Sequence, residues 1–465
     1  MNKLEKNLEY SVKDGAAHSV MMGAGEKYLS PYAIVLGATN IQIGLLTSIP
    51  QLLGSISQLF STKIAETIGS RKKMILIFAL IQSLVWIPIG SMFFYDSNAI
   101  LILILLASVY WICGLMGSPA WSSWIGDLVP DKIKGKFFGK RRRVEGISLF
   151  FSGVTAGLIL YFSAGYNPFI GFVVVFGISF FAKFISWTYL RRVDEPIFEV
   201  PDEAKFSFAA FLTKMPKTNF GKLVIYLVLI TFSVNITGPY FVVYMLKDLG
   251  MNYFTYMLVV NAGLVSNFLF ISIWGKYSDF FGNRKIISLT GYLVFLLPIL
   301  WIFSSDIIYL ILVQIFSGFI WSGFQISTFN FIFDNVSPPK RVRCVSYYNV
   351  LNGIAIFLGA SFGGFLLRFG SMFWSNFILI LMVSSAARFL SSFIMLPMIK
   401  EVKWVKKVSE QKLIIGVVSD AFEGIKYPVL FVSGRRLMIK NKTEEFFKWI
   451  ENNILKLLRI KHKYS

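Results

Sequence analysis

The chain has 465 residues, of which 55% are hydrophobic, 17% aromatic and 15% charged, and its mean hydropathy is +0.64. This composition excludes an ordinary soluble protein and indicates a membrane protein with many spanning helices. The formal net charge of +21 suggests nucleic-acid binding, but the lysines and arginines gather in alternate loops, as membrane insertion produces; we therefore expect no nucleic-acid partner.

Few residues are available for metal or catalytic chemistry. His18 and His462 are the only histidines, and Cys113 and Cys344 are the only cysteines. They provide no cluster for a zinc site, a disulfide framework or a histidine-based catalytic triad. The sequence also lacks a Walker loop and a nucleophile elbow. We therefore expect no enzyme activity, no metal, no cofactor and no ATP-driven pumping.

Apolar segments long enough to cross a bilayer, roughly 20 residues each, follow one another along the chain. They divide it into a first group of spans in residues 1–190, a charged cytoplasmic linker 191–221, a second group in 222–400 and a basic tail 401–465. The twelve predicted spans are Tyr10–Gly37, Ile41–Ile64, Met74–Phe94, Ala99–Ile125, Val144–Ser163, Pro168–Leu190, Lys222–Leu246, Tyr253–Tyr277, Lys285–Ser304, Ile307–Phe333, Cys344–Leu367 and Ser371–Ile399.

Two charged residues, Glu26 and Lys27, lie inside the first predicted span. A charge at that depth costs at least ~2.5 kcal/mol by insertion scales, so each residue should face a cavity, pair or titrate. Neighbours on a helix diverge by about 100°, so they should not pair with each other. Glu26 is the candidate proton carrier or ligand for a cationic substrate group; the alternative is a structural pair with a basic residue of another span. Lys27 could instead extend its stem to the outer interface.

The second span carries a stripe of small and polar residues at helical spacing. Such a stripe allows close helix packing and hydrogen bonds between helices, or it lines an aqueous path. The stripe consists of Thr47, Gln51, Gly54, Ser55, Gln58 and Thr62.

Two polar loops between apolar segments share one spacing. Residues 62–72 read TKIAETIGSRK and residues 275–285 read GKYSDFFGNRK. In such a turn Gly282 can take a positive φ without steric cost, and Gly275 lets another helix approach closely. The equivalent pairs are Glu66 and Asp279, Gly69 and Gly282, Arg71 and Arg284, and Lys72 and Lys285.

The pattern Gly-x-x-x-Asp-x-x-Gly-x-Arg-Lys between membrane helices resembles the signature loop of major facilitator superfamily transporters. The second loop matches at every named position, whereas the first departs at Thr62 and Glu66. The loop after the fourth span, with Asp127, adds to this resemblance, which covers residues 10–400. It implies an all-α membrane fold of two six-helix bundles, and a latch in which Asp279 lies near Arg284 and the start of the eleventh span.

By the same resemblance Glu66 would act toward the fifth span. Both acids would hold the cytoplasmic side closed, each stabilised at a helix N-terminus by roughly 0.3 to 1 kcal/mol. The alternative is that the basic residues after them only anchor the topology. These basic residues are Arg71, Lys72, Lys73, Arg284 and Lys285.

The two halves of the chain are related as repeats. Asp127 corresponds to Asp334 at a displacement of 207 (334 − 127), and Lys183 corresponds to Arg388 at 205 (388 − 183). Three glycines of the fifth span return in the eleventh with similar displacements. This predicts duplicated bundles related by an axis along the membrane normal. Lys183 and Arg388 are intramembrane bases for which we expect a structural role, reaching the interface or pairing with the acids of the cytoplasmic gate.

Uncharged hydrogen-bonding groups in the second half, together with tryptophans, could form a mixed aromatic and amide pocket for a neutral or amphipathic solute. Ordinary helix packing is the alternative for each of them. The residues are Asn235, Asn261, Asn267, Gln325, Asn330, Trp111, Trp121 and Trp321.

The basic loops define the expected topology. Loops rich in lysine and arginine lie in the cytoplasm, which places both termini there in a multi-pass protein of the plasma membrane. Residues 401–465 contain a predicted amphipathic helix after Thr443 that could lie on an anionic inner leaflet.

The sequence thus predicts a monomeric secondary transporter that moves a small organic solute through the lipid bilayer by alternating access, coupled to protons or another ion. An uncoupled facilitator of the same fold is the nearest alternative. A receptor or scaffold that signals through residues 401–465 is an alternative of another class. The sequence indicates neither the solute nor the direction of movement.

Overall fold

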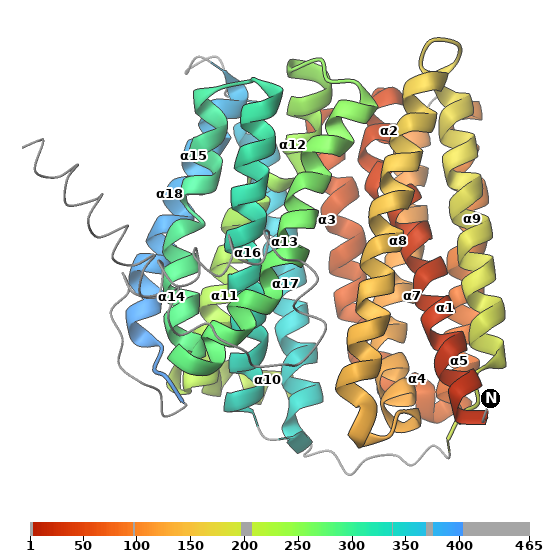
Figure 1. The fold of residues 1–465 in the computed structure, drawn as a ribbon. Helices are drawn as coiled ribbons and strands as arrows, with labels where there is room; N and C mark the ends of the chain where they lie inside the picture. Colours follow the sequence, from red (N-terminus) through yellow and green to blue (C-terminus); the bar gives the residue numbers. More distant parts are fainter. Residues whose placement is uncertain (1–2, 96–97, 197–206, 337, 369–374, 403–465) are drawn as a thin grey trace, which may run out of the picture. The chain divides into compact units, whose positions relative to one another are not determined.

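The computed structural model describes residues 3–95, 98–196, 207–336, 338–368 and 375–402. Every regular element in these ranges is helical (Figure 1). The α-helices of the first half are α1 (Lys3–Ala24), α2 (Leu29–Val35), α3 (Asn40–Ser57), α4 (Ser61–Ile68), α5 (Arg71–Leu84), α6 (Trp86–Gly90), α7 (Ala99–Leu128), α8 (Lys134–Ser163) and α9 (Pro168–Arg192).

The second half begins with the short helix α10, which lies within the predicted linker. Its α-helices are α10 (Phe208–Lys214), α11 (Asn219–Asn235), α12 (Phe241–Val243), α13 (Tyr253–Phe281), α14 (Asn283–Leu293), α15 (Leu296–Phe303), α16 (Ile307–Asn335), α17 (Pro338–Leu366) and α18 (Asn376–Met395). A π-helix, Tyr244–Asp248, follows α12.

Eleven helical stretches of the described chain are long and apolar enough to cross a membrane. The remaining predicted span, the first, corresponds to α1 and α2, and α1 starts with polar turns that contain Glu5, Glu9, Lys13 and Asp14. With this span included, the structure agrees with the predicted twelve.

The first predicted span is not one continuous α-helix, because a 3-10 turn at Glu26–Tyr28 interrupts it. Pro31 has no amide hydrogen and its ring clashes with the carbonyl four residues earlier, which is that of Lys27. The two charged residues of the first span therefore lie in a break between α1 and α2.

The same cause divides three other predicted spans. In each, an α-helix ends at or next to the fourth residue before a proline, where the ring displaces a backbone carbonyl. The prolines are Pro88 after α5, Pro239 after α11 and Pro298 after α14. Proline does not always act in this way, since Pro50 and Pro119 lie inside α3 and α7.

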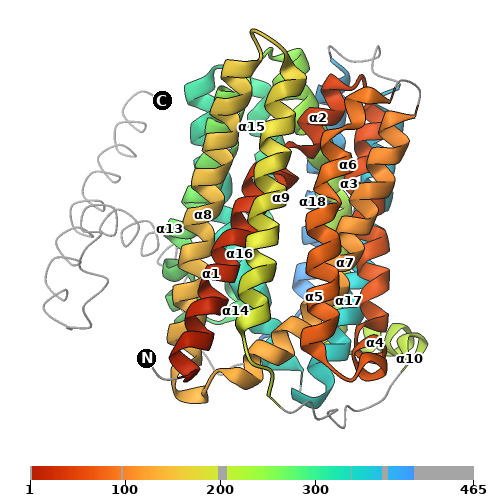
Figure 2. The same cartoon turned by 90° about the vertical axis from the view of Figure 1, so that its right-hand side faces the viewer.

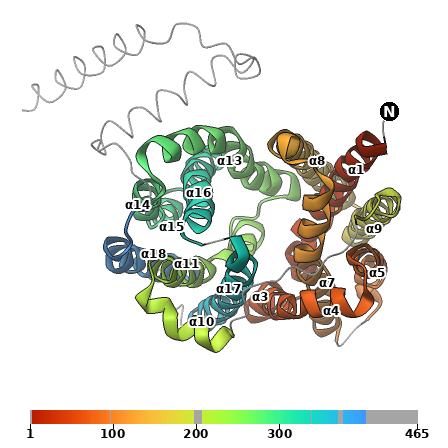
Figure 3. The ribbon, with the colours of Figure 1, turned by 90° about the horizontal axis from the view of Figure 1, so that it is seen from below.

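The helices gather by sequence half. Seen along the helix axes, α1 to α9 lie on one side and α11 to α18 on the other (Figure 3). The two groups meet where α3 packs against α17 and α8 packs against α13, and Figure 2 shows α1, α8 and α9 running beside one another. Asn349 of α17 donates a hydrogen bond of 2.8 Å to the Gln58 side chain, which joins the two halves directly.

The repeated glycines of α8 and α17 lie at helix contacts. A β-carbon at Gly153 would lie 2.9 Å from Met257 of α13, and one at Gly353 would collide with Ser55 of α3. Close packing of small residues therefore joins the two halves at both lines of contact.

We predict that Gly318→Ala lowers the thermal-unfolding midpoint, because a β-carbon there collides with the Gly263 carbonyl oxygen of α13. Overpacking of this kind costs about 1 to 3 kcal/mol. Gly177→Ala in α9 is the matched control, since a β-carbon there has no neighbour within 4 Å, and its midpoint should stay or rise. An unchanged midpoint for Gly318→Ala contradicts the packing described for α13 and α16.

Candidate functional site

Both polar loops turn on a glycine with positive φ. Gly69 ends α4 with φ of +69°, and Gly282 separates α13 from α14 with φ of +90°, so the prediction for Gly282 is confirmed and Gly69 behaves in the same way. The Ser70 side chain then caps α5 by accepting a hydrogen bond from the Lys73 amide. Each loop thereby presents its basic pair at the start of the following helix.

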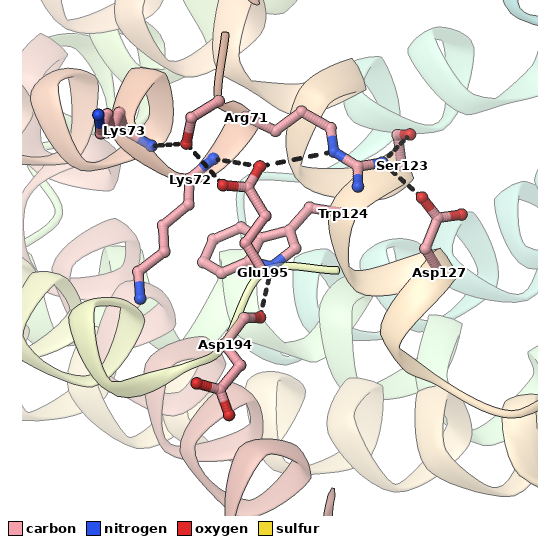
Figure 4. A network of polar contacts seen from close by, with 9 residues as sticks. Arg71, Lys72, Lys73, Ser123, Trp124, Asp127, Asp194 and Glu195 are labelled. Atoms are coloured by element: carbon pink, nitrogen blue, oxygen red, sulfur yellow. Dashed lines mark hydrogen bonds and ion pairs between the residues drawn. The ribbon is translucent and has the colours of Figure 1, made fainter. Parts of the chain in front are cut away.

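Arg71 is the centre of the first loop's contacts (Figure 4). Its side chain is 2% exposed, and Nη1 donates to Asp127 and, over 2.7 Å, to the Ser123 hydroxyl of α7. Nε lies 3.7 Å from Oε1 of Glu195, in the segment that follows α9. A buried guanidinium needs such partners, because removing one leaves an uncompensated buried charge.

Glu195 also caps the start of α5. It accepts hydrogen bonds from the Ser70 hydroxyl and from the Lys72 amide, the latter over 3.1 Å. A carboxylate at this place is favoured because the first amides of a helix lack partners within the helix. The segment after α9 is thus fixed to the loop between α4 and α5.

The neighbouring Asp194 ties the same segment to α1 and α7. Its carbonyl accepts from Trp124 over 2.8 Å, and its carboxylate accepts from the Asn7 amide over 2.9 Å. This hydrogen bond, helped by the Lys3 ammonium, lowers the pKa of Asp194. The contact therefore stabilises the fold above the pKa of the unfolded chain and is lost as the pH falls through the lowered value.

The second half repeats this arrangement. The Arg284 amide donates to Oε2 of Glu401 over 2.8 Å, and its Nε donates to the Ile399 carbonyl over 2.8 Å. Asn283 donates to Asp334 over 2.7 Å. Glu401 corresponds to Glu195 at a displacement of 206 (401 − 195), so in both halves the segment after the last span caps the helix that follows the polar loop.

Sequence reasoning missed Glu195 and Glu401. Both follow their spans at the displacement that relates the other repeat pairs, and this signal could have found them. The predicted latch is not formed here: Asp279 is exposed, and the Arg284 side chain contacts Ile399 instead. Glu66 is likewise exposed. Glu195 and Glu401 cap α5 and α14, whereas the latch was predicted at the starts of the fifth and eleventh spans.

Two further residues of the second loop were given roles by the sequence. The close approach predicted at Gly275 is wrong, because a β-carbon there would meet only Ile326, at an ordinary 3.9 Å. Lys285 is partly buried in the first turn of α14.

A charged cavity of about 310 Å³ lies among α1, α5, α7, α8 and α9. Its residues on α1 recur every four positions, which places them on one face of the helix. They are Asp14, His18 and Met22, and Glu26 continues the spacing in the 3-10 turn after α1. The aromatic side chains of the wall are Phe78, Tyr110, Trp111 and Trp121.

Glu26 lies in this cavity with a neutral partner. Its Oε2 accepts a hydrogen bond of 2.8 Å from the Tyr110 hydroxyl, and it forms no ion pair within the part of the chain that the structure describes. Lys27 is exposed on the other side of the break. The two residues therefore diverge, as predicted.

The other charges of the cavity are grouped toward the start of α1. Asp14 accepts from Arg141 over 3.0 Å and from Ser186 over 2.7 Å. Lys183 Nζ lies 3.0 Å from His18 Nδ1. The structure thus gives Asp14 and Arg141 a buried ion pair, and it brings Lys183 of α9 into the cavity beside α1.

The polar residues predicted to line one central pocket lie at several places. Gln51 donates to the Thr47 carbonyl, Asn235 to the Thr231 carbonyl and Asn330 to the Ser278 hydroxyl. Asn261 is buried, and its Nδ2 has no hydrogen-bond partner among the described residues. Gln325 is exposed and accepts from Asn267 over 3.4 Å.

All three predicted tryptophans and both predicted bases line cavities of their own half, with Trp121 and Lys183 in the charged cavity. Trp111 lines the charged cavity, and Trp321 lines a smaller cavity beside Arg388. The tryptophans of the single mixed pocket expected from the sequence are therefore divided between the two halves, and its predicted amides line neither of these cavities.

We predict that Glu195→Gln and Glu401→Gln each lower the thermal-unfolding midpoint, by an amount equivalent to about 1 to 3 kcal/mol. Each change weakens the acceptor that closes a helix start, and Glu195→Gln also removes a charge beside buried Arg71. Glu66→Gln is the control, because this acid is exposed. Equal midpoints for all variants and the unchanged protein contradict this role.

The comparisons with known proteins agree on one family. The sequence profile of the Major Facilitator Superfamily matches residues 19–229 and 223–447. No curated protein matches the chain.

Solved structures of transporters share the fold. The nucleoside transporter NupG is 16% identical, with a TM-score of 0.61, over 86% of this chain and 100% of its own. A bacterial homologue of the iron transporter ferroportin, inward-facing, is 14% identical, with a TM-score of 0.64, over 85% and 98%. A bacterial homologue of the lysosomal transporter Spinster is 13% identical, with a TM-score of 0.57, over 91% and 97%.

Proposed function

Because the chain belongs to the major facilitator superfamily and is a multi-pass membrane transporter, we propose that it moves a small organic solute by alternating access, coupled to protons or another cation. Transport itself follows from the family; the coupling and the solute class are the proposal. The coupling rests on Glu26, a carboxylate in a cavity whose hydrogen-bond partner is neutral.

A carboxylate at membrane depth without a basic partner is costly as an anion. It lowers this cost by taking up a proton or by binding a cation. Tyr110 can donate its hydroxyl hydrogen to the ionised carboxylate or accept one from the protonated form, so the site tolerates both states. A group that is stable in both states is suited to carry a proton between two sides of a membrane.

The α1 face supports a path for that proton. His18 lies eight residues and Asp14 twelve residues before Glu26, which is about 12 Å and 18 Å toward the N-terminus at a helix rise of 1.5 Å per residue. Both have side-chain atoms that exchange protons. We propose that the N-terminus of α1 and the basic loops are cytoplasmic, which makes this the inward end of the path.

The two loop networks each hold one half together. Two contacts, Arg71 with Glu195 and Arg284 with Glu401, fix the segment after the last span of each half. They attach it to the start of the third span of that half, which is α5 or α14. We propose that these contacts keep each half rigid while residues 1–190 and 222–400 move as two bundles. Glu66 and Asp279 stay free of those contacts and remain candidates for a latch formed in another conformation.

The lining of the charged cavity favours an organic solute with a neutral or cationic group. Three acids, Asp14, Glu26 and Glu145, and two bases, Arg141 and Lys183, line it, which leaves one negative charge in excess (3 − 2). Aromatic faces such as those of Trp111 and Trp121 attract cations. The volume is at the lower end of the range for organic ligands, roughly 300 to 1,000 Å³.

We predict that Glu26→Gln abolishes coupling. Full-length protein in proteoliposomes with an internal pH indicator is screened with primary amines and nucleosides for solute-driven proton movement. In Glu26→Gln this proton signal should fall at least about tenfold, because an amide does not carry the proton, whereas exchange of labelled solute between the two sides should persist.

Lys27→Gln is the matched control, because the neighbouring residue is exposed. Proton movement of unchanged size in Glu26→Gln contradicts the proposed coupling. Solute flux without any ion movement in the unchanged protein favours the uncoupled facilitator. The signalling alternative depends on residues 401–465, of which 403–465 lie outside the described residues; deleting residues 403–465 should leave flux intact if the chain is a transporter.

A further inference from the structure

A second cavity lies inside the C-terminal half, among α11, α15, α16 and α18 and the turn before α12. Its volume is about 190 Å³. The walls are aromatic and apolar, and the polar groups that reach it come from α16 and α18. The residues that matter here are Trp301, Gln314, Ser317, Trp321 and Arg388.

Arg388 is the charged residue of this cavity. It is 4% exposed and lies in the middle of α18, away from both helix ends. Two hydrogen bonds reach its guanidinium: Nη1 donates to the Val294 carbonyl and Nη2 to the Thr237 hydroxyl, both over 3.3 Å. These distances exceed the usual 2.7 to 3.2 Å range, and Nε has no partner among the described residues.

No acid compensates the charge of Arg388. Between residues 222 and 400 the sequence holds four acids, and all four lie at helix ends: Asp248, Asp279, Asp306 and Asp334. Within the described ranges, Arg388 forms no ion pair. A buried guanidinium with this environment lacks the counter-charge that buried ions require.

The repeat-related position in the first half is different. Lys183 lines its own cavity together with the acids Asp14 and Glu145, and it lies 3.0 Å from His18. The same place in the fold therefore holds a cation in both halves, with acids nearby in the first half only. If Arg388 served helix packing alone, its buried charge would need acids nearby, as Lys183 has in the first half.

We propose that the cavity beside Arg388 binds a small organic monocarboxylate. A guanidinium pairs with a planar carboxylate through parallel hydrogen bonds, and the unpartnered Nε supplies one of the donors. Gln314 and Ser317 offer further polar groups, while Trp301 and Trp321 form walls suited to an apolar tail. This site lies in the other half from Glu26, and its existence does not depend on the proposed coupling.

Benzoate binding to purified full-length protein tests this site, with the thermal-unfolding midpoint as readout. Benzoate at about 10 mM should raise the midpoint by about 2 °C or more, because a ligand of the folded state stabilises it. Benzamide, which has the same ring without the charge, should not. Arg388→Gln should abolish the benzoate shift, and Arg368→Gln, which removes an exposed arginine after α17, should retain it.

Each opposite result overturns the proposal: no shift with benzoate, an equal shift with benzamide or with matched sodium chloride, or a benzoate shift that survives Arg388→Gln. Should Arg388→Gln fail to fold, Arg388→Lys decides. Lysine keeps the charge and loses the planar fork, so benzoate affinity measured by tryptophan fluorescence should fall about tenfold or more. Unchanged affinity in that variant also rejects the site.

Discussion

A charged side chain withdrawn from water must be paired, hydrogen-bonded or directed into a cavity. This constraint divides the buried ions of the protein into those that pair with another charge and those that face a cavity. Arg71 is paired with Asp127 and Glu195, and Arg141 is paired with Asp14. These ions fix helices to one another. Glu26, Lys183 and Arg388 form no ion pair in the described chain, and each faces a cavity; Lys183 contacts His18 in a cavity that also holds acids, so we assign Glu26 and Arg388 to a proton, a solute or an anion.

The acids after the sixth and twelfth spans cap equivalent helices in the two halves of the chain. Glu195 accepts from the Lys72 amide and Glu401 from the Arg284 amide. Both acids satisfy backbone donors at a helix start, where no intrahelical partner exists. Because each of these contacts lies within one half, it stabilises that half without restricting movement between the halves.

Prolines break the helices beside the two cavities. Pro31 breaks the first span where Glu26 leaves the regular helix, and Pro298 frees the Val294 carbonyl that accepts from Arg388. A proline removes a donor and displaces the carbonyl four residues earlier. Within a bilayer such carbonyls must find other donors, so the breaks and the buried polar side chains belong to the same local structure.

The sequence by itself determined the all-helical membrane fold, the twelve spans and the internal repeat, because apolar length and residue spacing depend only on local chain properties. It also indicated Glu26, Gly282 and the basic loops. Only the tertiary structure decided that Glu195 rather than Glu66 contacts Arg71, that the predicted amide side chains line neither of the two cavities, and that Arg388 lacks an acid. The physical reason is that partners of buried charges come from helices distant in sequence, and packing alone determines which of them meet.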